Sequence, residues 1–103
     1  MIDARKAVLA AQDYFNSMLD LLNQDSLLVV SDVRLEEVEM SEDKKYWLIT
    51  FGYNLVSQLE FQKNRTSIAL NKEIVKSKEN RHYKILKVNT NNGEVESMKN
   101  REV

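Results

Sequence analysis

The chain of 103 residues carries 15 basic and 16 acidic side chains, a formal net charge of −1, and neither cysteine nor proline. Balanced charge provides no global field that would attract nucleic acid or an anionic membrane surface. The absence of cysteine excludes disulfides, thiolate metal ligands and cysteine nucleophiles. Leu, Ile, Val and Phe account for 30 residues, which is well above the range of disordered chains. We therefore expect a single folded domain over residues 1–103.

No apolar run approaches the roughly 20 residues that cross a membrane. Acidic and polar residues interrupt the apolar pattern at the N-terminus, which is unlike a signal peptide. We expect a cytoplasmic location by default, and an extracytoplasmic one if the chain is a mature or truncated form that has lost a leader.

Residues 3–22 are predicted to form an amphipathic helix. Apolar side chains recur at helical spacing and form one stripe: Val8, Ala11, Phe15, Met18 or Leu19, and Leu22. This spacing is typical of a helix with one buried face. Asp3 is placed to cap the first turn, because its carboxylate can accept hydrogen bonds from backbone amides there.

Residues 27–40 are predicted to form a strand that contains a β-bulge. Its apolar residues have two parities, with Val29, Val33 and Leu35 on one and Val38 and Met40 on the other. Because one extra residue moves every later side chain to the other face, a bulge near Glu36 and Glu37 would restore a single apolar face. Residues 41–44 are then a hairpin turn.

Residues 46–61 are predicted to form the central strand of the core. Apolar residues occupy every odd position except Ser57: Trp47, Ile49, Phe51, Tyr53, Leu55, Leu59 and Phe61. Since side chains alternate along a strand, this row lies on one face. A straight strand of this length would reach about 53 Å, far beyond the usual range. We therefore expect a bend at Gly52 or Ser57.

The C-terminal part is predicted to complete an antiparallel sheet. Residues 66–76 fit a strand, although a helical turn is the alternative. Residues 82–99 fit a hairpin around Asn92-Gly93, a dipeptide that favours a type I′ turn. The expected fold is α+β, with one N-terminal helix packed on a curved antiparallel sheet of four to five strands.

This order of segments resembles the PepSY domain family, whose members carry a helix and end in a hairpin of the form Tyr-x-Val-x-Val-x-x-x-x-Gly-x-Val. The residues in those places are Tyr83, Ile85 or Leu86, Val88, Gly93, Glu94 and Val95. The order is also similar to cystatin-like folds, in which a curved sheet grips a helix. Asn89 stands where the family usually has Asp, and the inhibitory Gln-x-Val-x-Gly motif of cystatins is missing. The resemblance implies a small, non-catalytic domain that binds or regulates another protein, in some relatives a peptidase.

The sequence offers few groups for catalysis or metal binding. His82 is the single histidine, and no Asp-x-Asp-x-Asp loop is present, so the usual metal-ligand spacings are missing. A group of acidic side chains could supply a carboxylate pair, but a solvated acidic edge is the favoured interpretation: Glu36, Glu37, Glu39, Glu42 and Asp43. We therefore assign no catalytic, cofactor-binding or metal residue, expect no cofactor, and favour a binding protein over an enzyme.

Three aromatic side chains of the central strand, Trp47, Phe51 and Tyr53, could line a ligand pocket. Burial in the core is the favoured interpretation, because aromatic rows at strand spacing are usually core. The alternative function is a small-ligand-binding or enzymatic domain that uses the concave face of the sheet, with Trp47, Tyr53 or His82 at the mouth.

Charge is unevenly distributed along the chain. Residues 1–60 have a net charge of −6 and residues 61–103 a net charge of +5. The acidic group is Asp32, Glu36, Glu37, Glu39, Glu42 and Asp43, and the basic group is Lys72, Lys76, Lys78, Arg81, Lys84 and Lys87. One interpretation is cross-strand pairing within the sheet. The other is a two-ended surface that docks a charged protein partner or a second copy of the chain. Nucleic acid is not expected, because the pI is acidic and aromatic interleaving is limited to Tyr83.

Overall fold

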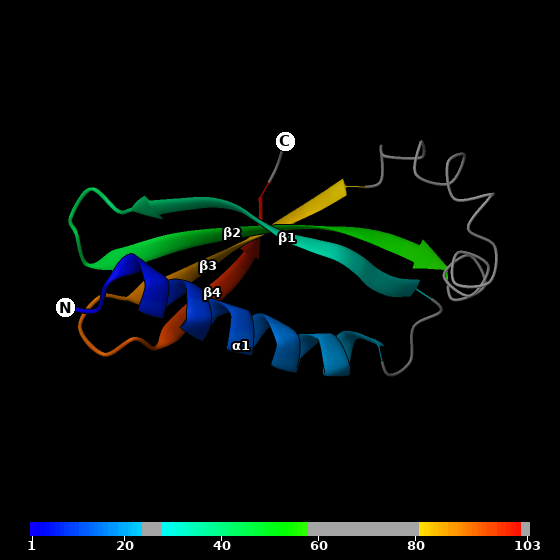
Figure 1. Cartoon of the computed structure of the whole chain (residues 1–103), viewed down its shortest axis with the longest axis horizontal. Coiled ribbons are helices and arrows are strands. Elements are labelled where there is room, and N and C mark those ends of the chain that lie inside the picture. Colours follow the sequence, from blue (N-terminus) through cyan, green and yellow to red (C-terminus); the bar gives the residue numbers. More distant parts are fainter. Residues whose placement is uncertain (24–27, 58–80, 102–103) are drawn as a thin grey trace.

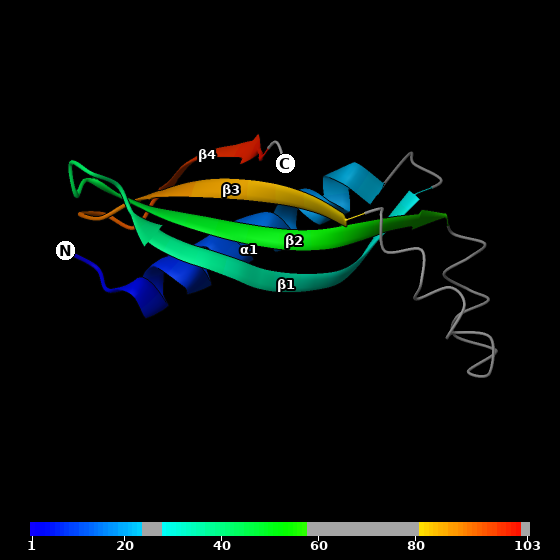
Figure 2. The same cartoon turned by 90° about the horizontal axis from the view of Figure 1, so that it is seen from above.

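The computed structural model describes residues 1–23, 28–57 and 81–101. Its elements are α1 (Ala4–Asn23), β1 (Leu28–Met40), β2 (Tyr46–Ser57), β3 (Arg81–Asn89) and β4 (Val95–Asn100). The strands form an antiparallel sheet, and α1 lies against one face of it (Figure 1). Figure 2 shows the strands side by side in the order β1-β2-β3-β4. β2 bows with its concave side toward α1. The predicted α+β fold is therefore confirmed, while the strand predicted over 66–76 lies outside the described residues.

Helix α1 contacts the sheet through a narrow stripe of small and aromatic side chains. The Lys6 amide donates to Asp3 Oδ1 at 2.9 Å, which confirms the predicted cap. Ala7, Ala11 and Phe15 are buried, and the two alanines let the helix approach the strands closely. Within the described part of the chain, no helix is long and apolar enough to cross a membrane.

The predicted row on the central strand faces the helix. Its three middle members, Ile49, Phe51 and Tyr53, are buried, and Trp47 and Leu55 pack against them. The Phe15 ring lies 5.3 Å from the ring of Phe51 and 5.7 Å from that of Tyr53. β3 adds Leu86 and Val88, which complete the core. Leu59 and Phe61 lie outside the described residues.

Strand β1 contains two irregularities where one was predicted. The register shift between Leu35 and Glu37 confirms the bulge, and it places Leu35 opposite Phe51 and Val38 opposite Ile49. A second shift lies between Ser31 and Arg34, and Asp32 there has a φ of 52°. Because of this second shift, Val30 rather than Val29 packs against the core. In contrast, the β2–β3 ladder runs through Gly52 without a shift.

The hairpin between β3 and β4 is confirmed, but its turn type is not. A type I′ turn needs a positive φ at both central residues, and of that pair only Gly93 has one, at 73°. The loop is longer than two residues, since the Asn89 amide donates to the Glu94 carbonyl at 2.9 Å and the Gly93 amide to the Asn89 carbonyl at 2.9 Å. The side chain of Asn89 accepts from the amides of Asn91 and Asn92, which stabilises this wider loop.

The N-terminal segment is held at the same end of the sheet. The Ile2 amide donates to the Thr90 carbonyl at 2.7 Å, and the Trp47 indole donates to the Ile2 carbonyl at 3.1 Å. The buried Thr90 hydroxyl donates to the carbonyls of Lys44 and Lys45 in the β1–β2 turn. These bonds tie the start of the chain to both hairpin turns.

Candidate functional site

The face of the sheet opposite α1 carries a charged cluster around Arg81. The Arg81 guanidinium donates to the Asp32 carbonyl at 2.7 Å and to Glu36 Oε1 at 3.1 Å, and it also pairs with the Asp32 carboxylate at 3.4 Å. Arg34 pairs with the same carboxylate at 3.0 Å. Arg81 lies on β3 and both acids lie on β1, so this contact passes over β2. The cluster therefore ties both irregular parts of β1 to β3.

Gly52 makes this contact possible. A Cβ at Gly52 would lie 2.8 Å from Glu36 Oε1 and 3.1 Å from Tyr83 Cε1. Tyr83 is the direct cross-strand partner of Gly52, an arrangement in which an aromatic ring covers the space left by a strand glycine. The glycine thus clears the middle of the face, and side chains from both neighbouring strands fill it.

The predicted basic group is divided between the two faces. Lys87 lies 4.2 Å from the centroid of the Tyr46 ring, whereas Lys84 bonds the Asn100 side chain and pairs with Phe51 on the helix side. Cross-strand pairing, the first interpretation of the charge pattern, is confirmed for Arg81. The three remaining predicted members, Lys72, Lys76 and Lys78, lie outside the described residues.

The predicted acidic group is also divided. The Asp43 carboxylate accepts from the Ser41 hydroxyl at 2.6 Å and from the Lys45 amide at 3.0 Å, and these bonds hold the pKa of Asp43 below its ordinary value. Asp43 thus stabilises the β1–β2 turn, next to the exposed Glu42. Glu37 is 3.9 Å from Arg101, and Glu39 is exposed. On β1, Glu37 and Glu39 are therefore the acidic side chains that lie outside the Arg81 cluster.

The three residues predicted for the mouth of a pocket do not come together. Tyr53 is buried, and this burial raises the pKa of its phenol. The His82 ring stacks on Tyr53 at 5.7 Å between centroids. Trp47 lies six residues from Tyr53 on the same strand, a separation of about 20 Å. Tyr53 and His82 are thus neighbours, and Trp47 belongs to the opposite end of the core.

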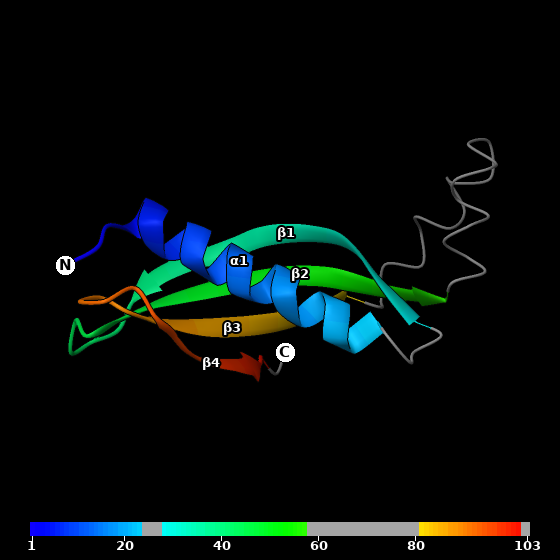
Figure 3. The same ribbon diagram turned by 90° about the horizontal axis from the view of Figure 1, so that it is seen from below.

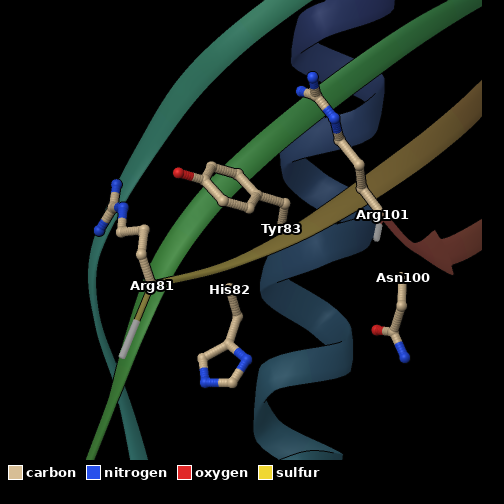
Figure 4. Close-up of a pocket in the computed structure, with 5 residues that line it drawn as sticks. All are labelled: Arg81, His82, Tyr83, Asn100 and Arg101. Atoms are coloured by element: carbon tan, nitrogen blue, oxygen red, sulfur yellow. The ribbon is translucent and has the colours of Figure 1, made fainter. Parts of the chain in front are cut away.

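A hollow of about 280 Å³ surrounds the start of β3, where β3 extends past the end of β4. Figure 4 shows that its side chains lie on opposite sides of the β3 ribbon, with Arg81, Tyr83 and Arg101 on one side and His82 and Asn100 on the other. Because these side chains point away from one another, they cannot all contact one bound molecule in this hollow.

A second hollow, which we call the α1–β1 groove, has a different character. It measures about 300 Å³ and is lined by two polar and five apolar side chains: Val8, Gln12, Phe15, Asn16, Val33, Leu35 and Phe51. Figure 3 explains its position, since α1 crosses the strands obliquely and moves away from the middle of β1. Phe15 and Phe51 form a buried apolar floor.

The side of β1 that faces α1 carries exposed apolar side chains. Val33 and Leu35, which line the groove, are 41% and 49% exposed, and Val38, farther along the same side of β1, is 38% exposed. Neighbouring exposed apolar side chains commonly mark an interaction site. Sequence reasoning assigned all three to the core face, and they do lie on that side of the sheet. The sequence did not predict their exposure, because the pattern of apolar residues in a strand does not show in which direction a helix crosses the sheet.

Among the described residues, no group of three or more His, Asp or Glu side chains is placed to hold a metal ion. Comparison of the chain with protein-family models, with curated proteins and with solved structures finds no match. The resemblance to PepSY and cystatin-like domains therefore stays a prediction.

Proposed function

We propose that the chain is a small, non-catalytic protein-binding module, and that the α1–β1 groove receives an extended segment of its partner. The observation that carries this proposal is the exposure of Val33 and Leu35 beside a buried aromatic floor, with the exposed Val38 farther along the same side of β1. Burial of such side chains supplies a driving force for association.

The lining of the groove favours a protein segment over other ligands. None of its lining side chains is charged, so it lacks the basic groups that contact phosphates in nucleic acids. Gln12 and Asn16 supply amides that can bond a backbone. An open apolar groove with a few polar groups is typical of sites for peptide segments.

A regulatory role agrees with this geometry. A PepSY-like or cystatin-like domain would act by occupying a surface of another protein, which requires a docking surface and no catalytic group. A peptidase is the partner class that the resemblance implies, and the groove provides a surface on which such a contact would form.

A random peptide library displayed on phage, selected on the purified chain, tests the proposal. Selected peptides are synthesised and their affinities measured by titration calorimetry. Leu35→Ser should weaken binding about tenfold or more, because removal of a buried apolar contact costs on the order of 1.5–3 kcal/mol. The side chain is half exposed, so the variant is expected to fold, which circular dichroism checks.

Leu21→Ser is the matched control. Leu21 is 61% exposed near the end of α1 and does not line the groove, so affinity should stay unchanged. Recovery of no binding peptide, or equal binding by wild type and Leu35→Ser, would refute the proposed function.

A further inference from the structure

We infer that the partner segment pairs with β1 as an added strand and presents basic, apolar and basic side chains opposite Glu37, Val38 and Glu39. This inference rests on the proposed function, since it specifies the chemistry of the segment that the groove receives. Four features of β1 carry it: its outer position, the regularity of its last residues, the alternation of its side chains, and the acidic charge of Glu37 and Glu39 outside the Arg81 cluster.

β1 is an outer strand of the described sheet. A strand has hydrogen-bonding groups along both edges, and one edge of β1 is paired with β2. The other edge meets no further strand among the described residues. Such an edge is a template for another strand, and addition of a strand is a recurring mode of peptide recognition.

The regular part of β1 determines where pairing begins. From Glu37 to Met40 the strand pairs with Thr50 to Trp47 without a shift. The shifts between Ser31 and Arg34 and between Leu35 and Glu37 interrupt regular pairing before that point. Bulges of this kind limit strand addition, so the register of a partner is set at residues 37–40.

Alternation in this part of β1 separates apolar from acidic side chains. Val38 is paired with the buried Ile49 and therefore faces α1. Glu37 and Glu39 are paired with Thr50 and Leu48 and face the opposite side. A strand added beside them would direct one set of side chains toward Val38, on the α1 side of the sheet where the groove lies, and the alternate set toward the two carboxylates.

Charge complementarity then indicates the chemistry of the partner side chains that face Glu37 and Glu39. Asp32 and Glu36 are already bonded to Arg81, which neutralises the earlier part of β1. Glu37 has only a 3.9 Å contact with Arg101, and Glu39 belongs to none of the ion pairs formed among the described residues. Lys or Arg at the two facing positions would complete opposite-charge cross-strand pairs, whereas acidic residues there would be repelled.

The test uses synthetic eight-residue peptides with blocked ends, in which Lys alternates with Val or Glu alternates with Val. Affinities are measured by calorimetry at low salt. The Lys peptide should bind about tenfold or more tightly than the Glu peptide, and its advantage should shrink at high salt because the facing charges are exposed.

Variants of the chain test the same contact from the other side. The Glu39→Lys variant should reduce the preference for the Lys peptide, and the double variant Glu37→Lys with Glu39→Lys should reverse it. Glu94→Lys, an exposed acid in the β3–β4 loop, makes the same charge change and should leave the preference intact.

Two N-methylated forms of the Lys peptide test strand addition itself. Methylation of alternate amides blocks one edge of the peptide, and methylation of the other set blocks the opposite edge. One form should lose binding and the other should retain it, since a single edge pairs with β1.

Specific outcomes overturn the inference. Equal or tighter binding of the Glu peptide overturns the basic chemistry, and retained binding by both methylated forms overturns strand addition. Library peptides that still depend on Leu35 would leave the proposed function intact in either case. A chain that fails to bind the Lys peptide, and that forms a dimer by light scattering which Leu35→Ser dissociates, would show that a second copy occupies the groove.

Discussion

Asn54 and Asn89 lie in neighbouring strands and differ in the hydrogen bonding of their side chains. Asn54 Oδ1 is buried and has no hydrogen-bond partner among the described residues. Asn89 Oδ1 accepts from the Asn91 amide at 2.8 Å and from the Asn92 amide at 3.2 Å, and Asn89 Nδ2 donates to Glu96 at 2.8 Å. A buried polar group without a partner destabilises the folded state, whereas a hydrogen-bonded group stabilises it.

The same substitution should therefore have opposite effects at the two positions. Asn54→Val removes an unsatisfied oxygen and improves strand propensity, so the free energy of unfolding should rise by about 1 kcal/mol. Asn89→Val leaves the loop amides without an acceptor, and the free energy should fall by about 1–2 kcal/mol. Urea denaturation of both variants measures these changes. A shift of both midpoints in the same direction would contradict the argument.

Residue-level prediction succeeded where the governing contact is local. Asp3 bonds an amide three residues away, so its capping role could be inferred from sequence. The turn at Asn92-Gly93 was assigned the wrong type, although the residues responsible are also near in sequence. The Asn89 side chain stabilises a wider loop, whereas Asn92-Gly93 favours a type I′ turn. Both preferences are local and of similar strength, so the sequence does not show which of the two turns forms.

At the scale of elements, β1 depends on a distant arginine for its irregular shape. The Arg81 side chain is only 19% exposed, and it bonds both the carbonyl and the carboxylate of Asp32, where the backbone has a positive φ. A positive φ at a residue other than glycine is disfavoured unless its surroundings support it. We infer that Arg81 supplies this support across the sheet.

Loss of Arg81 should loosen the irregular part of β1 first. Arg81→Ala should lower the free energy of unfolding by about 1–2 kcal/mol, since a charged donor to a carbonyl is lost together with partly exposed ion pairs. Hydrogen exchange of amides between Ser31 and Glu37 should accelerate more than that of the core strand β2. Arg101→Ala is the control, because its ion pair with Glu37 spans 3.9 Å and should contribute little. Equal acceleration in the two variants would contradict a special role for Arg81.

The parity of apolar residues was sufficient to predict one irregularity in β1 and insufficient for the other. The apolar residues change parity between Leu35 and Val38, and an extra residue in the strand is needed to keep both on one face, whichever strand is the partner. The shift near Asp32 is stabilised by Arg81, 49 residues away in sequence, and no local pattern records such a contact. Gly52 was a candidate for a bend in β2, and its observed effect is to let Glu36 and Arg81 meet above the strand.

At the scale of the whole molecule, the core was predictable and the candidate site was not. Alternation on β2 and helical spacing on α1 each identify a buried face, and the two faces meet as expected. Which parts of the sheet the helix leaves uncovered depends on its crossing direction. That direction results from packing between the two layers, so the exposure of Val33 and Leu35 appears only in three dimensions.

The helix and the described sheet share one core, and we therefore expect them to unfold in a single transition. Trp47 fluorescence reports the end of the sheet where Ile2 and Thr90 are bonded, and far-ultraviolet circular dichroism reports α1 and the strands together. The two signals should give the same urea midpoint, as in two-state unfolding. Phe15→Ala removes a buried ring that contacts Phe51 and Tyr53, and should lower both midpoints equally, with a loss of about 3–5 kcal/mol. This is a large share of the roughly 5–15 kcal/mol expected for a domain, so the measurement needs a low starting urea concentration. If the fluorescence midpoint stayed in place while the circular dichroism midpoint fell, α1 would unfold separately from the Trp47 end of the sheet, and the single cooperative unit would be disproved.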